Sequence, residues 1–254
     1  MIQIEFTDNA KAVLVADDNV IGLAVGGSWI TNEMDEFSDI DLVLVTKEKI
    51  SDNKDMMFTY AKRLGNFLSG FTGEHVGEPR LLICLYDEPL LHVDIKFVTL
   101  DEFYYRVENP VILMDKGGQL QNVIDNSKPE YPYPDYQWIE DRFWIWIHYI
   151  LLKIGRGEYL EALDCFGFLR AIVLGSLLHI KNGNLPRGVR RVETDIDKND
   201  FSKLTATIPD YNKQSLLVAL RNTVSLYNQL RATLFKDDIK LQKETEEMVM
   251  HYFS

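Results

Sequence analysis

The chain has 254 residues, of which 46% are hydrophobic and 26% charged, a balance that is ordinary for a folded globular protein. Its net charge is −12: residues 1–134 hold 11 Lys and Arg against 23 Asp and Glu, and residues 135–254 hold 16 of each. Proteins that grip a long polynucleotide need a basic face, so this distribution argues against nucleic acid as a partner. A small-molecule partner is favoured instead, and a positively charged one would suit the acidic half of the chain.

The N-terminal residues, the apolar stretches and the cysteines indicate in which compartment we expect the protein. Residues 1–5 lack the basic-then-apolar pattern of a secretion signal. The longest dense apolar stretch, residues 143–152, is too short and too interrupted to span a bilayer. Cys84 and Cys165 each lie in an apolar run, which predicts buried free thiols in a reducing compartment. We therefore expect a cytoplasmic protein without a membrane partner.

The first half of the chain shows both strand and helix patterns. Five strands are predicted, at residues 20–25, 38–45, 80–86, 90–98 and 110–114. Three helices are predicted, at residues 10–17, 54–67 and 100–107. Residues 46–53 and the glycine-containing residues 70–78 are predicted to be loops, the second of them flexible.

A proline-rich stretch separates the two halves. Residues 126–134 contain three prolines, which interrupt both helix and sheet, so we predict one domain at 1–128 and another at 135–254. Apolar residues in helical spacing predict four helices after it, at residues 135–154, 158–180, 212–234 and 238–252. The predicted fold class is α+β, with an N-terminal mixed sheet and flanking helices followed by a C-terminal helical bundle.

Two glycines and a serine follow the first predicted strand. Gly26 and Gly27 allow a positive φ and a close approach of the backbone to a ligand. A glycine turn between a strand and the start of a helix can present free N–H groups to an anion. Together with Ser28, these residues are candidates for binding phosphate groups.

Three aspartates stand out in the predicted strands, and the first two are candidate metal ligands. Side chains alternate along a strand, so Asp39 and Asp41 share one face of the second predicted strand. Two neighbouring carboxylates repel each other unless a cation lies between them, and Mg²⁺ prefers such oxygen ligands. Asp94 is an acid in an otherwise apolar strand, where it shares a face with His92 and Lys96.

The Gly-Gly-Ser turn, the ten-residue gap and the Asp-x-Asp strand resemble the signature of polymerase-β type nucleotidyltransferases. The sequence Ser-Asp-Ile-Asp-Leu at residues 38–42 is similar to the motif of the small-molecule branch, which includes aminoglycoside- and lincosamide-modifying enzymes. The helical half, residues 135–191, is also similar to these proteins, more diffusely. The resemblance implies a nucleotidyltransferase domain at 1–128 and an acceptor-binding helical domain at 135–254.

The resemblance also implies the chemistry. An acceptor hydroxyl would attack the α-phosphorus of ATP or another NTP, and two Mg²⁺ ions would stabilise the attacking and leaving oxygens. Asp39 and Asp41 would hold both ions, Asp94 would hold one and serve as general base, and Gly26, Gly27 and Ser28 would bind the nucleotide. Homodimers are common among the antibiotic-modifying members, so a homodimer is one expectation for the oligomeric state.

Several alternatives remain open in the sequence. Glu74 is a second candidate for the base, and His92 could assist proton transfer. No basic residue follows Ser28 closely, unlike in several relatives, so Lys153 and the cluster Arg187, Arg190 and Arg191 are candidates for meeting triphosphate charge. Lys96 could pair with Asp94. The acceptor could also be a protein or an RNA, as in an antitoxin-like module, or the chain could be a non-catalytic nucleotide-binding regulator.

Overall fold

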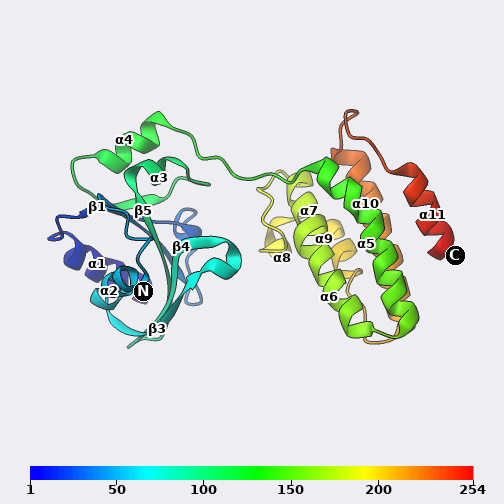
Figure 1. The fold of residues 1–254 in the computed structure, drawn as a ribbon, viewed down its shortest axis with the longest axis horizontal. Helices are drawn as coiled ribbons and strands as arrows, with labels where there is room; N and C mark the ends of the chain where they lie inside the picture. The colour runs from blue at the N-terminus through cyan, green and yellow to red at the C-terminus, as the bar shows by residue number, and fades with distance from the viewer. Residues whose placement is uncertain (254) are drawn as a thin grey trace. The chain divides into compact units, whose positions relative to one another are not determined.

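The computed structural model describes residues 1–253, which form two compact units (Figure 1). The first unit is Met1–Tyr131 and the second begins at Pro132, so the division falls inside the proline-rich stretch. Proline fixes φ and has no N–H to donate, which keeps such a stretch outside both helix and sheet.

The N-terminal unit is built on a six-stranded mixed sheet. The strand order is β3-β4-β5-β2-β1-β6, in which β2 and β5 are parallel and every other neighbouring pair is antiparallel. The parallel pair lies in the middle of the sheet, where parallel strands are covered on both faces. The strands are β1 (Val20–Val25), β2 (Ile40–Thr46), β3 (Asn66–Gly73), β4 (Glu78–Asp87), β5 (Leu91–Thr99) and β6 (Val111–Asp115).

Four α-helices cover the sheet, two on each face. One apolar cluster joins α1 and α2 to the strand residues that include Ile40, Leu42 and Ile95. A smaller cluster on the other face joins α3 and α4 to Val45 and Val98. The α-helices are α1 (Ile2–Leu14), α2 (Lys54–Arg63), α3 (Leu100–Tyr104) and α4 (Gln119–Asn126), and the 3₁₀ turns are η1 (Gly27–Trp29) and η2 (Glu74–Val76).

The sequence prediction departs from the structure at three places in this unit, one of which is helix α4, which was not predicted. The first helix is Ile2–Leu14 and not residues 10–17, because Gln3, Thr7, Ala10 and Leu14 form one buried stripe at helical spacing. Residues 66–73 form strand β3, where we predicted the end of a helix and then a loop.

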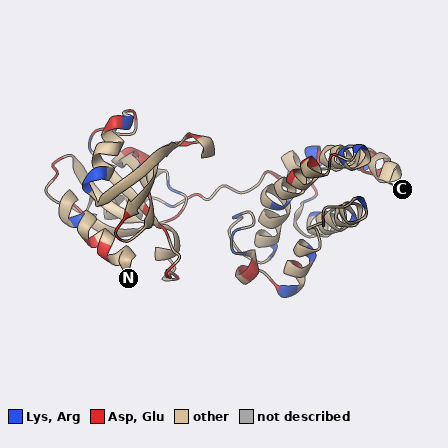
Figure 2. Cartoon of the chain, turned by 90° about the horizontal axis from the view of Figure 1, so that it is seen from below, with Lys and Arg blue, Asp and Glu red and all other residues tan. Residues whose placement is uncertain are grey.

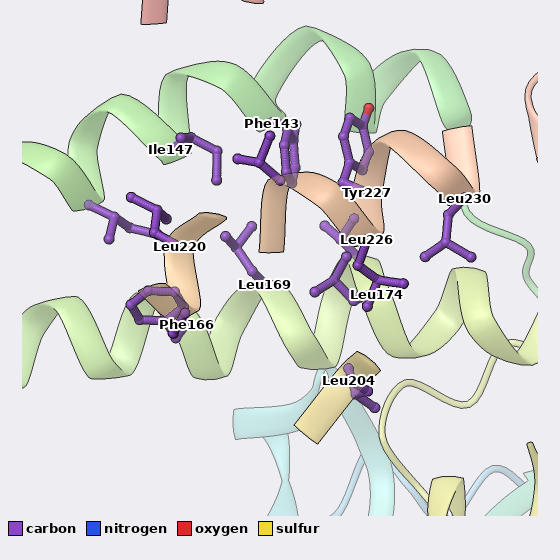
Figure 3. Close-up of a cluster of buried hydrophobic side chains, with 14 of the residues drawn as sticks. Phe143, Ile147, Phe166, Leu169, Leu174, Leu204, Leu220, Leu226, Tyr227 and Leu230 are labelled. Carbon is purple, nitrogen blue, oxygen red and sulfur yellow. The ribbon is translucent and has the colours of Figure 1, made fainter. Parts of the chain in front are cut away.

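The helical unit packs around one apolar core. Figure 3 shows its centre, where Phe143 of α5 lies beside Tyr227 of α10 with ring centroids 3.5 Å apart. Burying such rings supplies much of the apolar area that holds the helices together. The α-helices are α5 (Tyr136–Arg156), α6 (Tyr159–Leu169), α7 (Gly175–Lys181), α8 (Val192–Asp195), α9 (Lys198–Thr205), α10 (Lys213–Leu234) and α11 (Lys243–Phe253), and a π-helical turn, η3 (Arg170–Leu174), joins α6 to α7.

One continuous helical run, Tyr159–Lys181, is long and apolar enough to cross a membrane by length and composition, with a hydropathy of 1.6. The sequence analysis had singled out residues 143–152 and overlooked this run. Half of its 18-residue window, 50%, is buried inside the protein. Core helices of soluble proteins pass the same test, so the run is weak evidence for a membrane span.

The α+β fold class is confirmed, with the mixed sheet and flanking helices first and the helices of the second unit after them. Both cysteines are free thiols; Cys84 is buried, as predicted, and Cys165 is only partly buried.

Candidate active site

The parallel pairing of β2 and β5 brings two of the predicted acids together. Asp41 and Asp94 are direct partners in the register of the two strands, although 53 positions separate them in the chain. Cα atoms of such partners lie close enough for their side chains to interact on a shared face. The sheet itself therefore sets the distance between these two residues.

Both acids point to the same face of the sheet. Val45 of β2 and Val98 of β5 belong to the apolar cluster under α3 and α4. Because side chains alternate, Asp41 and Asp94, each four positions earlier, lie on that same face. Ile40 and Leu42 belong to the opposite cluster, with α1 and α2.

Asp39 lies just before β2, which begins at Ile40, and its side chain is exposed. Its negative charge acts on Asp94 and raises the pKa of that carboxyl. Asp41 and Asp94 thus lie within the paired central strands, and Asp39 lies just before the first residue of β2. In Figure 2, acidic residues are coloured red along the ribbon of the N-terminal unit, whose residues carry the entire net charge.

The two glycines after β1 pack against Asp41. The Gly26 N–H donates to the backbone carbonyl of Asp41 at 2.8 Å. Gly27 has a φ of +60°, and a Cβ placed there would lie only 2.0 Å from Oδ2 of Asp41. Glycine is therefore required at position 27 on two grounds, backbone conformation and space for a carboxylate.

This geometry corrects part of the prediction for the glycine turn. The Gly26 N–H is already used in the sheet, so it is not available to a phosphate group. Gly27 and Ser28 begin the turn η1, and the first N–H groups of such a turn have no partner within it. Gly27 and Ser28 remain candidates for binding phosphate groups, and the Gly26 N–H instead holds the backbone beside Asp41.

Asp94 is a half-buried acid with one close partner. Its Oδ1 lies 2.9 Å from Nε2 of His92, and its side chain is 21% exposed. The pKa of Asp94 is raised above its ordinary value, chiefly because burial disfavours the charged form. The hydrogen bond and charge of His92 oppose this rise, and Asp39 adds to it.

Lys96 does not pair with Asp94, which was one of the alternatives. Its Nζ lies 2.8 Å from Oε2 of Glu78, and the guanidinium of Arg80 donates to Oε1 of Glu78 at 2.7 Å and to Oε2 at 2.8 Å. The Arg80 hydrogen bond is the main reason that the pKa of Glu78 falls to about 2. The cation nearest to Asp94 along its strand is therefore engaged elsewhere.

This ion cluster gives a prediction about pH. A depressed pKa means that the charged form of Glu78 stabilises the fold above its unfolded-state value near 4.5, and that this contribution is lost as the pH falls towards 2. We expect Glu78→Gln to lower the free energy of unfolding by about 1–2 kcal/mol at pH 7, after allowance for partial exposure. Urea unfolding should show this difference shrinking between pH 5 and pH 2. Glu5→Gln, at an exposed position, should show little change at any pH, and an equal loss in both variants would contradict the assignment.

Gln3 is a positioning residue that the sequence analysis missed. Its side chain is 1% exposed, and its Nε2 donates to the carbonyls of Asp35 at 2.9 Å and Ser38 at 3.0 Å. The Asp35 carboxylate in turn accepts from the Phe37 N–H and the Ser38 hydroxyl. Helix α1 thus fixes the loop that leads directly into Asp39. The buried stripe on α1 was the signal that could have revealed Gln3.

We expect Gln3→Leu to destabilise the protein by about 1–3 kcal/mol, because two partly buried hydrogen bonds are lost. The loop before Asp39 should also become more mobile, which hydrogen exchange at Phe37 and Ser38 would detect. Glu5→Leu makes a similar change at an exposed position of the same helix, and it should leave exchange in the loop unaltered. Equal exchange in both variants would remove the positioning role.

The remaining candidates are engaged in other contacts. Glu74 pairs with Lys54 and accepts from Thr72, and these bonds lower its pKa to about 2, so it is a poor general base. Lys153 pairs with Glu158 at 2.7 Å and Glu161 at 2.9 Å in the helical unit.

The arginine cluster of residues 187, 190 and 191 lies between α7 and α8 of the helical unit, and Arg191 pairs there with Asp195 at 3.4 Å.

The fit of a metal ion can be judged from the donors at the site. In residues 1–253, no three His, Cys, Asp or Glu side chains are already grouped so that they could hold a metal ion. The chemistry of the donors nevertheless suits a hard divalent cation, since all three acids offer carboxylate oxygens. Burial is the main cause of the raised pKa of Asp94 and the charge of Asp39 adds to it, and a bound cation would offset both by favouring the charged carboxylate.

Comparisons with known proteins give matches among solved structures alone. No protein-family model matches the chain, and no curated protein sequence matches it. An aminoglycoside 6-adenyltransferase from Bacillus subtilis is 17% identical with a TM-score of 0.40, over 99% of this chain and 95% of that one. A nucleotidyltransferase-like protein from Exiguobacterium sibiricum is 12% identical with a TM-score of 0.35, over 89% and 74%. A CdnE c-di-GMP synthase from Capnocytophaga granulosa is 13% identical with a TM-score of 0.30, over 92% and 80%.

Because every TM-score lies below 0.5, we base the function of this chain on the residues of its own site.

Proposed function

We propose that this protein is a nucleotidyltransferase that moves a nucleoside monophosphate, AMP from ATP in the first instance, to a hydroxyl group of a small molecule in the cytoplasm. The observation that carries the proposal is the register of β2 and β5, which pairs Asp41 with Asp94 on one face beside the Gly26-Gly27 turn. Acids paired in this way on neighbouring strands favour a shared cation over a purely structural role.

The three aspartates are the proposed ligands of Mg²⁺. Carboxylate oxygens of Asp39, Asp41 and Asp94 would hold it, and the metal would lower the pKa of the acceptor hydroxyl and neutralise phosphate charge. Asp94 is the proposed general base: a bound cation would lower its pKa, but the same cation would acidify the acceptor hydroxyl whose proton it takes. His92, bonded to Oδ1, leaves the second oxygen of Asp94 for this task.

The nucleotide would bind where the chain offers N–H groups. Gly27 and Ser28 begin the turn η1, whose first N–H groups suit the oxygens of a triphosphate. The acidic balance of residues 1–134 favours a small and cationic acceptor over RNA.

The test is release of pyrophosphate from ATP by the full-length chain, with and without Mg²⁺, across a panel of hydroxylated acceptors that includes cationic and neutral members. We expect release to require both Mg²⁺ and an acceptor. GTP, CTP and UTP are tested in place of ATP under the same conditions. Absence of release with every nucleotide and acceptor, together with absence of Mg-ATP binding in calorimetry, would overturn the proposal. Incubation of the protein with labelled ATP and lysate would show whether a macromolecule is labelled instead.

A further inference from the structure

The helical unit contains a cavity of about 500 Å³ that has no part in the site described above. It lies between the end of α10, the segment that follows and the start of α11, and none of the acids of the candidate active site lines it. Its volume falls within the range of pockets that bind small molecules. The lining residues that matter here are Asn228, Phe235, Lys236, Ile239, Leu241 and Lys243.

One wall of the cavity is fixed by side chains of α5. Gln137 accepts a hydrogen bond from the Lys240 N–H at 2.8 Å and donates to the Lys240 carbonyl at 3.1 Å. The buried Glu140 accepts from the Gln242 N–H at 2.9 Å. The segment between α10 and α11 is therefore held in place, and the cavity is present without a ligand to shape it.

The charge at the rim is positive. Lys236 and Lys243 both line the cavity, and neither has an ion pair or side-chain hydrogen bond with another residue of 1–253. Asp237 is the one acid among the lining residues. The third cation, Arg231, is already neutralised, because its guanidinium donates to Glu140 at 3.1 Å and Glu246 at 2.8 Å. Two lysines thus remain to attract an anion.

Asn228 lines the same cavity and carries an unsatisfied acceptor atom. Oδ1 of Asn228 is buried and has no hydrogen-bond partner among residues 1–253, while its Nδ2 contacts Glu246 at 3.4 Å. A buried polar atom without a partner destabilises a protein by about 1–3 kcal/mol, so nearly all such atoms are satisfied. A ligand with an N–H or O–H donor would satisfy this one.

We propose that the cavity binds a phosphorylated small molecule with a flat body and an N–H donor, the chemistry of a nucleoside monophosphate. Lys236 and Lys243 bind the phosphate, a dianion for which a pair of ammonium groups is suited. Phe235, Ile239 and Leu241 contact the flat body, and Oδ1 of Asn228 accepts from its amino group. This proposal does not depend on the proposed catalytic function, since it uses none of the same residues.

The test is a titration of the full-length protein with AMP in the presence of EDTA, followed by NMR of isoleucine methyl groups. The Ile239 methyl reports on the cavity, and the Ile40 methyl reports on the N-terminal unit, where it is buried in β2 on the face opposite Asp41. We expect the Ile239 signal to shift in a saturable manner while the Ile40 signal stays in place. Adenosine lacks the phosphate and ribose 5-phosphate lacks the flat base, so each should bind at least about tenfold more weakly than AMP.

Variants give the matched comparison. The double variant Lys236→Gln and Lys243→Gln should raise the Kd for AMP about tenfold or more, because it removes both phosphate contacts. Lys240→Gln alters a lysine of the same segment that does not line the cavity, and it should leave the Kd unchanged. An Ile239 signal that does not move, or a Kd that is the same in the double variant and the wild type, would overturn the proposal. So would binding of adenosine as tight as that of AMP.

Discussion

Asp41→Asn should reduce the rate of nucleotidyl transfer by at least about 10²–10³-fold. The substitution preserves the size of the side chain and removes its charge, at the position where β2 is paired with Asp94. Pyrophosphate release at saturating ATP measures the effect, and a thermal melt should show that the variant remains folded. Asp18→Asn changes an exposed acid ahead of β1 and is the matched control, which should retain full activity. An Asp41→Asn variant as active as the wild type would remove the proposed mechanism.

Asp94→Asn separates activity from stability in the same experiment. The raised pKa of Asp94 means that the folded chain binds this proton more tightly than the unfolded chain does. Its charged form therefore destabilises the fold at neutral pH, and the effect disappears once the pH is below the ordinary Asp range, where both states are protonated. We expect the variant to lose activity as Asp41→Asn does and to have a higher Tm than the wild type at pH 7. A lower Tm at pH 7 would show that Asp94 is held by interactions that favour its charge.

Gly27→Ala should disturb the site through the neighbouring carboxylate. A Cβ at this position would lie 2.0 Å from Oδ2 of Asp41, so that carboxylate must move, and the φ of +60° is strained for alanine. A left-handed residue other than glycine is disfavoured by about 1–2 kcal/mol, and misplacement of a catalytic group by 1 Å can reduce the rate about 10²-fold. We expect losses of that size in urea unfolding and in pyrophosphate release.

Gly26→Ala is the matched control for the stability measurement. Gly26 has an extended backbone, with φ of −105°, and the nearest atom to an added Cβ is Cβ of Asp41 at 3.6 Å, an ordinary contact. This variant should lose much less stability than Gly27→Ala. If the two variants were equally unstable, crowding against Asp41 would not be the cause.

The central part of the site was predictable because it depends on local alternation. Strand β1, Val20–Val25, has the predicted bounds, and the alternation along β5 places His92, Asp94 and Lys96 on the more exposed face. A single sequence is enough to recognise an apolar run that ends at two glycines. It is also enough to recognise an acid within an otherwise apolar strand. A single sequence does not reveal which residues face each other on neighbouring strands. The ion pair of Lys96 with Glu78 could not be predicted for this reason, because it depends on β4 lying next to β5.

Glycine caused the largest error in the N-terminal unit. Gly70 and Gly73 suggested a flexible loop, yet they lie in β3, where an added Cβ would come within 2.8 Å of the carbonyls of Ile83 and Glu78, respectively. Glycine inside a strand marks a place where another backbone approaches closely, a condition set by the partner strand. The role of Gln3 was missed for a similar reason, because its two acceptors lie 32 and 35 residues away in the chain.

The parallel pairing of β2 with β5 also determines which changes in chain length this protein tolerates. Lengthening the turns at residues 47–53 or 88–90 leaves the register intact, and longer loops add little entropic cost to closure. One extra residue between Leu91 and Asp94 would instead turn the Asp94 side chain to the opposite face, among Val93, Ile95 and Phe97. Homologous chains can therefore gain or lose residues at these turns, whereas a single insertion within either strand would move an acid out of the site.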